Sequence, residues 1–278
     1  MMLSLPSRLA YPRLVDSDDP VVIVGMHRSG TSLLAKLLED CGVHMGVRQS
    51  RSKTESLLFR DINTLVLELT GQSWRCIQGL PDVDELIDGY DWIEAKMRKE
   101  LQARLVPDYL GASALIRIML GPLHWGWKDP RTSLVLPLWS RIFPNARVIH
   151  ICRDGRDAAL SLLARDAKTA DASGEGPTER QVERFIADFR LWELYLQRIQ
   201  QASRLFSAFY SIRYEDLLDR PGPVLADILG WLGLDPRPAE QAARIVDPTR
   251  ANRAKRNDPD WLRRLDLSSP RLIEHRYE

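Results

Sequence analysis

The segment that most constrains the fold of this chain runs from Val21 to Leu34, where an apolar, β-branched stretch leads into a glycine-bounded loop and then into a helical pattern. Gly25 and Gly30 permit the backbone conformations and the close approach that a bound phosphate requires. The helix would open with N–H groups directed at that phosphate, and these belong to Ser29, Gly30, Thr31 and Ser32. The pattern predicts a phosphate-binding loop, although a tight strand-to-helix turn has the same spacing.

We call residues 25–30 the first loop, and it lacks the lysine of a nucleoside-triphosphate site. Gly25 and Gly30 have the spacing of the motif G-x-x-x-x-G-K-[ST], but Thr31 stands where that lysine would be. The only cation inside the loop is Arg28. A P-loop kinase, which also needs Mg²⁺, is therefore disfavoured. A dinucleotide-binding site is disfavoured too, since no G-x-G-x-x-G motif follows any expected strand.

A second stretch of the chain repeats the succession of strand, turn and helix. The strand expected over residues 147–152 is followed by Arg153-Asp154-Gly155-Arg156-Asp157, which we call the second loop, and then by a helix that carries Ser161. The guanidinium of Arg153 is permanently charged and forked, which suits phosphate oxygens, and the Ser161 hydroxyl adds a donor. The chain thus offers two anion sites, unless the second loop is a solvated turn with Arg–Asp pairs of its own.

Together, the two loops resemble the two cofactor signatures of the sulfotransferase family, whose donor is 3′-phosphoadenosine 5′-phosphosulfate (PAPS). The resemblance implies that the first loop binds the 5′-phosphosulfate, and that Arg153 and Ser161, with the spacing found in the family, bind the 3′-phosphate. PAPS and its product 3′-phosphoadenosine 5′-phosphate (PAP) are charged at both ends, which calls for two anion sites and no metal. Arg165 and Tyr214 match positions that contact the 3′-phosphate in protein-tyrosine sulfotransferases, although a surface cation and an interfacial aromatic residue fit equally well.

The segment Trp125-Gly126-Trp127-Lys128-Asp129-Pro130 resembles the Lys-Asp-Pro motif of bacterial and protein-tyrosine sulfotransferases. Because proline keeps the preceding residues extended, we expect Lys128 at the end of a short strand. In those relatives the lysine lies against the sulfuryl group, which implies that Lys128 and Arg28 stabilise the charge that develops during transfer. The arginine in the first loop follows the same branch, since cytosolic sulfotransferases carry a lysine there. A surface salt bridge of Lys128 with Asp129 or another neighbour is the alternative.

Glu55 stands where a helical pattern begins, after the polar stretch 48–53. The catalytic glutamate of Golgi and bacterial sulfotransferases lies on the corresponding segment, which implies that Glu55 is the general base for the acceptor hydroxyl. The alternative is that Glu55 only complements the helix dipole. The cytosolic branch uses a histidine, so His124 and His44 are rival bases.

The alternation of apolar stretches and helical patterns is typical of an α/β fold. Strands are expected over residues 21–24, 147–152 and 208–213, and helices over 31–41, 83–104, 155–164, 179–203 and 222–232. We expect a single domain over residues 20–278, preceded by a tail over 1–19, in which helices cover both faces of a mostly parallel, P-loop-type sheet. Both loops would then lie at carboxyl ends of strands, in one cleft.

Two further stretches have open interpretations. Residues 168–178 combine glycines, a proline and small residues, which predicts a flexible loop that is either a lid over the acceptor or an ordinary exposed connection. Residues 249–256 hold four cations and no acid. Such a run is usually a solvated face, although the resemblance implies a basic loop that folds over the cofactor.

Composition limits the partners of the chain. The formal net charge of +1 over 278 residues gives no general attraction to nucleic acid, so anion binding must be local. Three cysteines without a C-x-x-C pair fit a reducing compartment and argue against a disulfide framework or a zinc site. The sequence has no secretion signal and no long apolar run, so we expect a cytoplasmic protein without an integral membrane segment.

The resemblance therefore implies a PAPS-dependent sulfotransferase. The acceptor would be a hydroxyl of a saccharide, a glycolipid, a small natural product or a peptide tyrosine, and the oligomeric state is left open. A non-catalytic PAP- or PAPS-binding relative is the alternative, but the joint presence of Arg28, Glu55 and Lys128 favours the enzyme.

Overall fold

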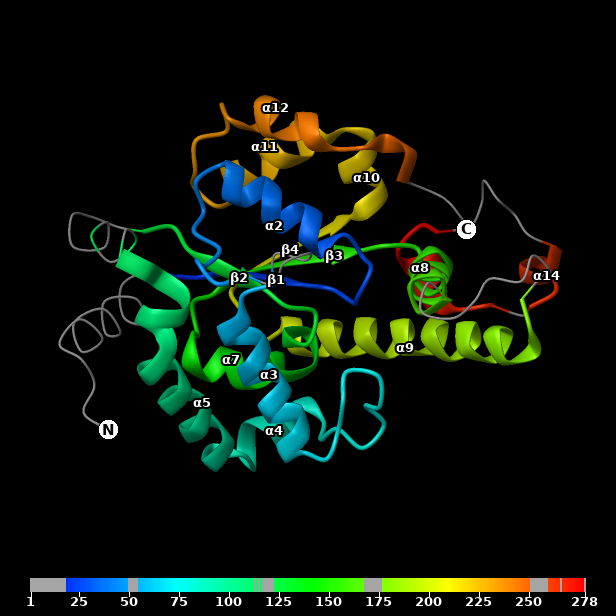
Figure 1. Ribbon diagram of the computed structural model, residues 1–278, viewed down its shortest axis with the longest axis horizontal. Helices are drawn as coiled ribbons and strands as arrows, with labels where there is room; N and C mark the ends of the chain where they lie inside the picture. Colours follow the sequence, from blue (N-terminus) through cyan, green and yellow to red (C-terminus); the bar gives the residue numbers. More distant parts are fainter. Residues whose placement is uncertain are drawn as a thin grey trace.

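The computed structural model describes residues 19–49, 55–112, 114, 116, 123–167, 177–250, 260–265 and 267–277. Within them, four parallel strands form one sheet in the order β2-β1-β3-β4 (Figure 1). The strands are β1 (Val21–Val24), β2 (Gly126–Lys128), β3 (Arg147–Cys152) and β4 (Ala208–Arg213). The strands expected over 21–24, 147–152 and 208–213 are confirmed, as is the short strand that ends at Lys128.

Both faces of the sheet are buried, which is why the inner strand β1 reads as a continuous apolar run. Along β1, the side chains of Val22 and Val24 join one hydrophobic cluster, and those of Val21 and Ile23 join another. This division follows from the alternation of side chains along a strand. A strand buried on both sides needs helices above and below it.

Helices supply both covers. On one side lie α2 (Thr31–Asp40), α10 (Tyr214–Asp219), α11 (Pro221–Trp231) and α12 (Ala239–Ala242). On the other side lie α3 (Leu57–Leu69), α4 (Val83–Asp88), α5 (Asp91–Arg104), α7 (Thr132–Ile142) and α9 (Glu179–Ser203), with α8 (Gly155–Ala167) packed against α9. The shorter elements are η1 (Leu105–Leu110), η2 (Ala243–Ile245), η3 (Pro248–Arg250), α14 (Asp260–Arg263) and α15 (Pro270–Glu274). Figure 1 shows the two layers, which confirm the expected α/β architecture.

The expectation of one helix over residues 83–104 is wrong, because the chain forms α4 and α5 there. A reciprocal capping box starts α4: the Asp82 carboxylate accepts the N–H of Glu85 (2.8 Å), and the Glu85 carboxylate accepts the N–H of Asp82 (2.9 Å). The helix ends at Asp88 with Gly89 as its C-cap, and Tyr90 has a non-helical backbone (φ −124°, ψ 35°). Glycine disfavours helix by about 1 kcal/mol relative to alanine, so the break falls where local propensity is lowest.

The sequence pattern does not predict α7. Nearly all of its side chains are buried, so the helix has no polar face, and Pro137 inside it argues locally against a helix. The helix is kinked at Val135 (φ −114°, ψ 17°). Tertiary packing between the sheet and α9 outweighs these local preferences.

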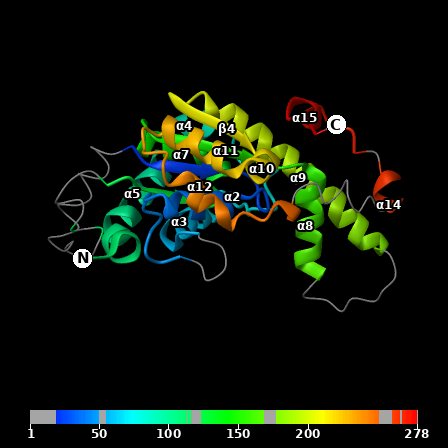
Figure 2. The ribbon, with the colours of Figure 1, turned by 90° about the horizontal axis from the view of Figure 1, so that it is seen from above.

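Because all the described strands are parallel, their carboxyl ends meet at one edge of the sheet, which we call the carboxyl edge. There β1 leads into the first loop, β2 ends at Lys128, β3 leads into Arg153, and β4 leads into Tyr214. This edge faces the end of the molecule where α8 lies, whereas α5 lies at the other end (Figures 1 and 2).

Candidate active site

The first loop depends on both of its glycines. A Cβ at Gly25 (φ 151°) would lie 2.4 Å from the carbonyl oxygen of Ile151 on β3, and a Cβ at Gly30 (φ 93°) would lie 2.2 Å from the Tyr214 ring. The N–H of Gly25 donates to Ser133 Oγ (3.0 Å). Gly30 is the left-handed N-cap of α2, so the helix opens directly from the loop, as the sequence predicts.

The second loop holds Arg153 in a buried position. Its side chain donates to the carbonyl oxygen of Arg28 (3.2 Å) and pairs with Asp157 (3.0 Å). The guanidinium carbon lies 5.0 Å from the centroid of the Tyr214 ring, within the range of a cation–π interaction. An Arg–Asp pair does form, but the alternative of a solvated turn is wrong, because Arg153 is only 7% exposed.

The two loops contact each other. The Nε–H of Arg28 donates to Ser161 Oγ (2.8 Å), across 133 residues of sequence. Arg28 has a φ of 74°, a left-handed conformation that residues other than glycine rarely adopt. Such strain is typical of functional sites. The structure therefore brings the two predicted anion sites side by side.

Arg165 lies one turn beyond this contact on α8. Its guanidinium donates to Asp166 Oδ1 (2.9 Å) and lies 5.5 Å from the centroid of the Trp74 ring. The same indole is contacted by Arg75 (4.5 Å) and by the His27 ring of the first loop, with the ring centroids 4.1 Å apart. Trp74 thus connects the first loop to α8, a position that its sequence context does not reveal.

Lys128 and Glu55 form a buried ion pair at the carboxyl edge. Lys128 Nζ lies 3.3 Å from Glu55 Oε1, and the two side chains are 0% and 8% exposed. Glu55 directly precedes Ser56, which is the N-cap of α3. Ser56 also forms an isolated antiparallel bridge with Gln49. The alternative of a surface salt bridge between Lys128 and Asp129 is therefore wrong.

Asp129 instead belongs to a buried network behind Lys128. It pairs with Arg131 (2.7 Å) and accepts a hydrogen bond from Asn63 Nδ2 (2.8 Å). Asn63 also donates to Thr132 Oγ1 (2.8 Å) and accepts from Trp139 Nε1 (2.7 Å). Burial raises the pKa of Asp129. Sequence reasoning missed Asn63, whose one signal is a polar amide at helical spacing between Phe59 and Leu67, on the buried face of α3.

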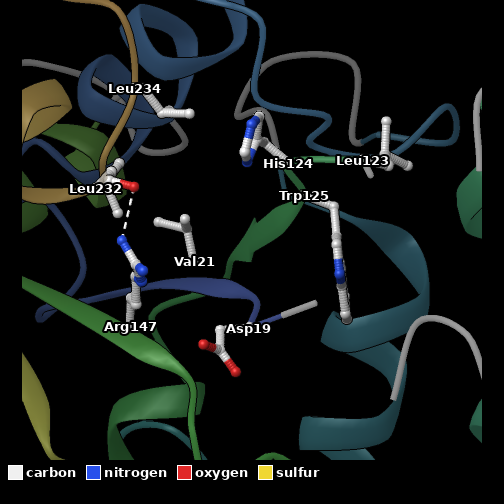
Figure 3. A pocket seen from close by; sticks show the side chains of 8 residues that line it. All are labelled: Asp19, Val21, Leu123, His124, Trp125, Arg147, Leu232 and Leu234. Atoms are coloured by element: carbon white, nitrogen blue, oxygen red, sulfur yellow. Dashed lines mark hydrogen bonds between the residues drawn. The ribbon is translucent and has the colours of Figure 1, made fainter. Parts of the chain in front are cut away.

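The rival bases His124 and His44 lie at the opposite edge of the sheet. The N–H of His44 donates to the His124 carbonyl (2.8 Å), and His44 pairs with Trp125, ahead of β2. His124 lines a small cavity of about 220 Å³ together with Asp19 and Arg147 (Figure 3). The length of β2 therefore separates both histidines from Lys128, whereas Glu55 contacts it.

Several expectations fall outside the described residues: most of the tail over 1–19, residues 168–176 of the expected flexible loop, and residues 251–256 of the basic run. Of that loop, Thr178 is described and caps α9. In the part of the chain that the structure describes, no group of three or more His, Cys, Asp or Glu residues is arranged to hold a metal ion. Among the same residues, no helix is long and apolar enough to span a membrane.

Comparison with known proteins gives one family match and several structural likenesses. Residues 20–238 match the family model described as the sulfotransferase family. A candidate protein-tyrosine sulfotransferase from Caenorhabditis elegans is 28% identical over 108 residues. That match covers 38% of this chain and 39% of the relative, so the chain aligns with about two fifths of the length of this curated protein.

Two solved structures show the same fold at low sequence identity. The sulfotransferase domain of the Synechococcus PCC 7002 olefin synthase is 21% identical with a TM-score of 0.50, and the match covers 91% of this chain and 86% of that one. The sulfotransferase domain from the curacin biosynthetic pathway is 19% identical with a TM-score of 0.51, covering 93% and 86%.

Proposed function

The chain belongs to the sulfotransferase family, and from that premise we propose that it transfers a sulfuryl group from PAPS to a hydroxyl acceptor, with Glu55 as the general base. One observation carries the proposal: the buried Glu55–Lys128 pair lies at the same edge of the sheet as the joined loops. A carboxylate, a fixed ammonium and two anion sites are the groups that sulfuryl transfer requires.

The residues fit a ligand with negative charge at both ends. The first loop offers the N-terminus of α2 and the guanidinium of Arg28, and it approaches Ile151 and Tyr214 so closely that no Cβ fits at its glycines. The second loop offers the guanidinium of Arg153 and the hydroxyl of Ser161. When bound, PAPS supplies the sulfuryl group and a phosphate leaving group. These residues would hold its 5′ and 3′ ends.

Glu55 and Lys128 divide the chemistry between them. Glu55 accepts the proton of the acceptor hydroxyl while the acceptor oxygen attacks sulfur and the bond from sulfur to the bridging phosphate oxygen breaks. As Glu55 becomes neutral, its attraction for Lys128 falls, and the ammonium turns to the oxygens on which negative charge is growing. Arg28 stays protonated at neutral pH, so its part is electrostatic.

The buried pair also distinguishes the enzyme from a non-catalytic binding protein. A buried ion pair is often no more stabilising than an apolar pair of similar volume, because both charges lose their hydration. A protein that only bound PAP would gain little from Glu55 and Lys128. The requirement for a base and a cation in the reaction accounts for both.

Nucleotide binding tests the proposal directly. Titration calorimetry in EDTA is expected to show PAP binding at micromolar strength or better, with ATP and Mg²⁺ much weaker. Since hydrogen bonds to charged groups contribute about 1.5–3 kcal/mol, Arg153→Ala should weaken PAP binding by about 10- to 100-fold. The matched control is Arg147→Ala on the same strand, where the guanidinium donates to the Leu232 carbonyl at the opposite edge.

The result that overturns this assignment is loss of PAP binding in EDTA, or an Arg153→Ala variant with the affinity of the control. A preference for ATP with Mg²⁺ would point to a kinase instead. Transfer from labelled PAPS to saccharides, glycolipids, small natural products and tyrosine peptides would then identify the acceptor class.

A further inference from the structure

Residues 270–277 lie beyond the family match, which ends at residue 238, yet they reach the second loop. Here α15 ends in a turn in which Arg276 has a φ of 58° and the N–H of Tyr277 donates to the Leu272 carbonyl (2.7 Å). This is the Schellman arrangement, with arginine at the position that glycine usually occupies. The turn directs the Tyr277 side chain inward, where it is only 2% exposed.

The Tyr277 hydroxyl connects to the backbone of the second loop through one carboxylate. It donates to Glu215 Oε2 (2.9 Å), and Glu215 Oε1 accepts the N–H of Asp154 (3.2 Å). Glu215 is only 6% exposed and follows Tyr214 at the start of α10. Both of its oxygens therefore have a protein donor.

The peptide group between Arg153 and Asp154 is held on both sides. Its N–H donates to Glu215, and its carbonyl oxygen accepts from Trp192 Nε1 (3.0 Å). Because rotation of this peptide changes ψ of Arg153, the two hydrogen bonds fix the direction in which the guanidinium leaves the backbone. The bond from Trp192 is set by the position of α9. The bond to Glu215 is set by the Tyr277 hydroxyl, which holds the Glu215 carboxylate in place.

Two arginines strengthen the same connection. Arg156 binds the Asp154 carboxylate through Nε (2.9 Å) and Nη2 (2.6 Å), and Nη2 also donates to the Tyr277 carbonyl oxygen. The guanidinium of Arg213 lies 4.7 Å from the centroid of the Tyr277 ring and donates to the Arg276 carbonyl (3.1 Å). The ends of β3 and β4 and the 270–277 segment are thereby tied together.

We propose that Tyr277 is a positioning residue for the nucleotide 3′-phosphate: it holds Glu215, which holds the Arg153–Asp154 peptide and so directs the Arg153 guanidinium. The inference rests on the proposed function, in which Arg153 binds that phosphate. A segment outside the matched family region thereby strengthens the preference of the protein for nucleotides that carry a 3′-phosphate.

Tyr277→Phe tests this role because it removes the hydroxyl and keeps the ring. Calorimetric titration of PAP and of adenosine 5′-phosphate should show PAP affinity reduced by about tenfold, the lower end of what outer partners of a ligand-binding residue contribute at metal sites. Affinity for adenosine 5′-phosphate should stay within about twofold, since this nucleotide has no 3′-phosphate for Arg153 to bind. In turnover, KM for PAPS should rise while kcat is retained.

Tyr109→Phe is the matched control. Its hydroxyl is also buried and donates to the Gly126 carbonyl (2.6 Å), but it lies at the opposite edge of the sheet. Both variants should lose some thermal stability, and only Tyr277→Phe should show a smaller preference for PAP over adenosine 5′-phosphate. If Tyr277→Phe does not fold, Glu215→Leu breaks the same connection from the other side and carries the same expectation.

The measurements distinguish failure of the role proposed for Tyr277 from failure of the proposed function. A Tyr277→Phe variant that keeps the wild-type ratio of PAP to adenosine 5′-phosphate affinity would overturn the role of Tyr277 and leave the proposed function standing. A wild-type protein without preference for PAP would overturn the assignment of Arg153 itself. Equal losses for both nucleotides, or equal losses in the Tyr109→Phe control, would show that Tyr277 is only structural.

Discussion

Replacing Lys128 by methionine separates the structural role of the buried cation from its chemical role. Methionine keeps the aliphatic stem and removes the ammonium, so the buried Glu55 carboxylate loses a partner 3.3 Å away. Two opposite unit charges at that distance attract each other by about 5 kcal/mol at an effective dielectric constant of about 20. Much of that energy only offsets the lost hydration of both groups.

Removing one member of a buried pair is nevertheless costly, because the other charge is left uncompensated. We expect a loss of about 3 kcal/mol in the free energy of unfolding, near the lower end for such pairs because Glu55 retains some exposure. For a protein of this size, that loss lowers Tm by about 6–12 °C. Combining Lys128→Met with Glu55→Gln should restore most of it, since no buried charge is then unpaired.

The effect of Lys128→Met on the rate of transfer should be separate from its effect on stability. The added Glu55→Gln substitution should not restore that rate. By comparison with oxyanion donors, loss of the ammonium should raise the activation free energy by about 2–4 kcal/mol, or slow transfer by about 30- to 900-fold. PAP affinity should change little, because the interaction strengthens as charge develops. Single-turnover rates at saturating PAPS, measured well below Tm, report this step.

The double variant tests only the origin of the lost stability, because it also lacks the proposed base. A slow single-turnover rate in the single Lys128→Met variant, measured well below its Tm, places Lys128 in the chemistry. A Lys128→Met enzyme with the wild-type single-turnover rate and only a lower Tm would refute the reasoning and make the Glu55–Lys128 pair a structural feature.

Two other substitutions probe the base and the first loop. Glu55→Gln keeps the shape of the side chain and removes the proton acceptor, so turnover should fall by about 10²–10⁴ while PAP affinity stays within a few fold; full activity in a turnover assay would exclude Glu55 as the base. Gly30→Ala should weaken PAP binding and lower Tm, since its Cβ would lie 2.2 Å from the Tyr214 ring. Gly42→Ala has a similar φ of 95° but open space, so in calorimetry and thermal melts it should show only the backbone cost of about 1–2 kcal/mol; equal effects of the two would show that Tyr214 does not define the loop.

The sequence predicts structure best where the physical requirement acts on neighbouring residues. The strand over residues 21–24 is a continuous β-branched run because both of its faces are buried, and that pattern is visible without a structure. The first loop was recognisable because left-handed conformations and close approach select glycine at positions 25 and 30. The second loop followed from Arg153 at the end of another such strand.

Helix propensity and amphipathic pattern fail to predict the structure where tertiary packing outweighs them. The helix α7 contains Pro137 and has hardly any polar surface, so neither propensity nor amphipathic pattern marks it. The break at Gly89 divides what reads as one helix, because glycine weakens the helical pattern without specifying where the chain turns.

The sequence alone determined which chemical groups this protein has and on which kind of element each lies: a glycine loop, a cation after a strand, a carboxylate at the start of a helix. Only the tertiary structure decided their partners, pairing Lys128 with Glu55 rather than Asp129, and bringing Tyr277 to Glu215. The physical reason is that backbone conformation and strand burial restrict which residue types can occupy adjacent positions in the sequence. A contact between side chains far apart in the sequence is fixed by how the helices pack on the sheet, and a single lysine, glutamate or tyrosine carries no record of it.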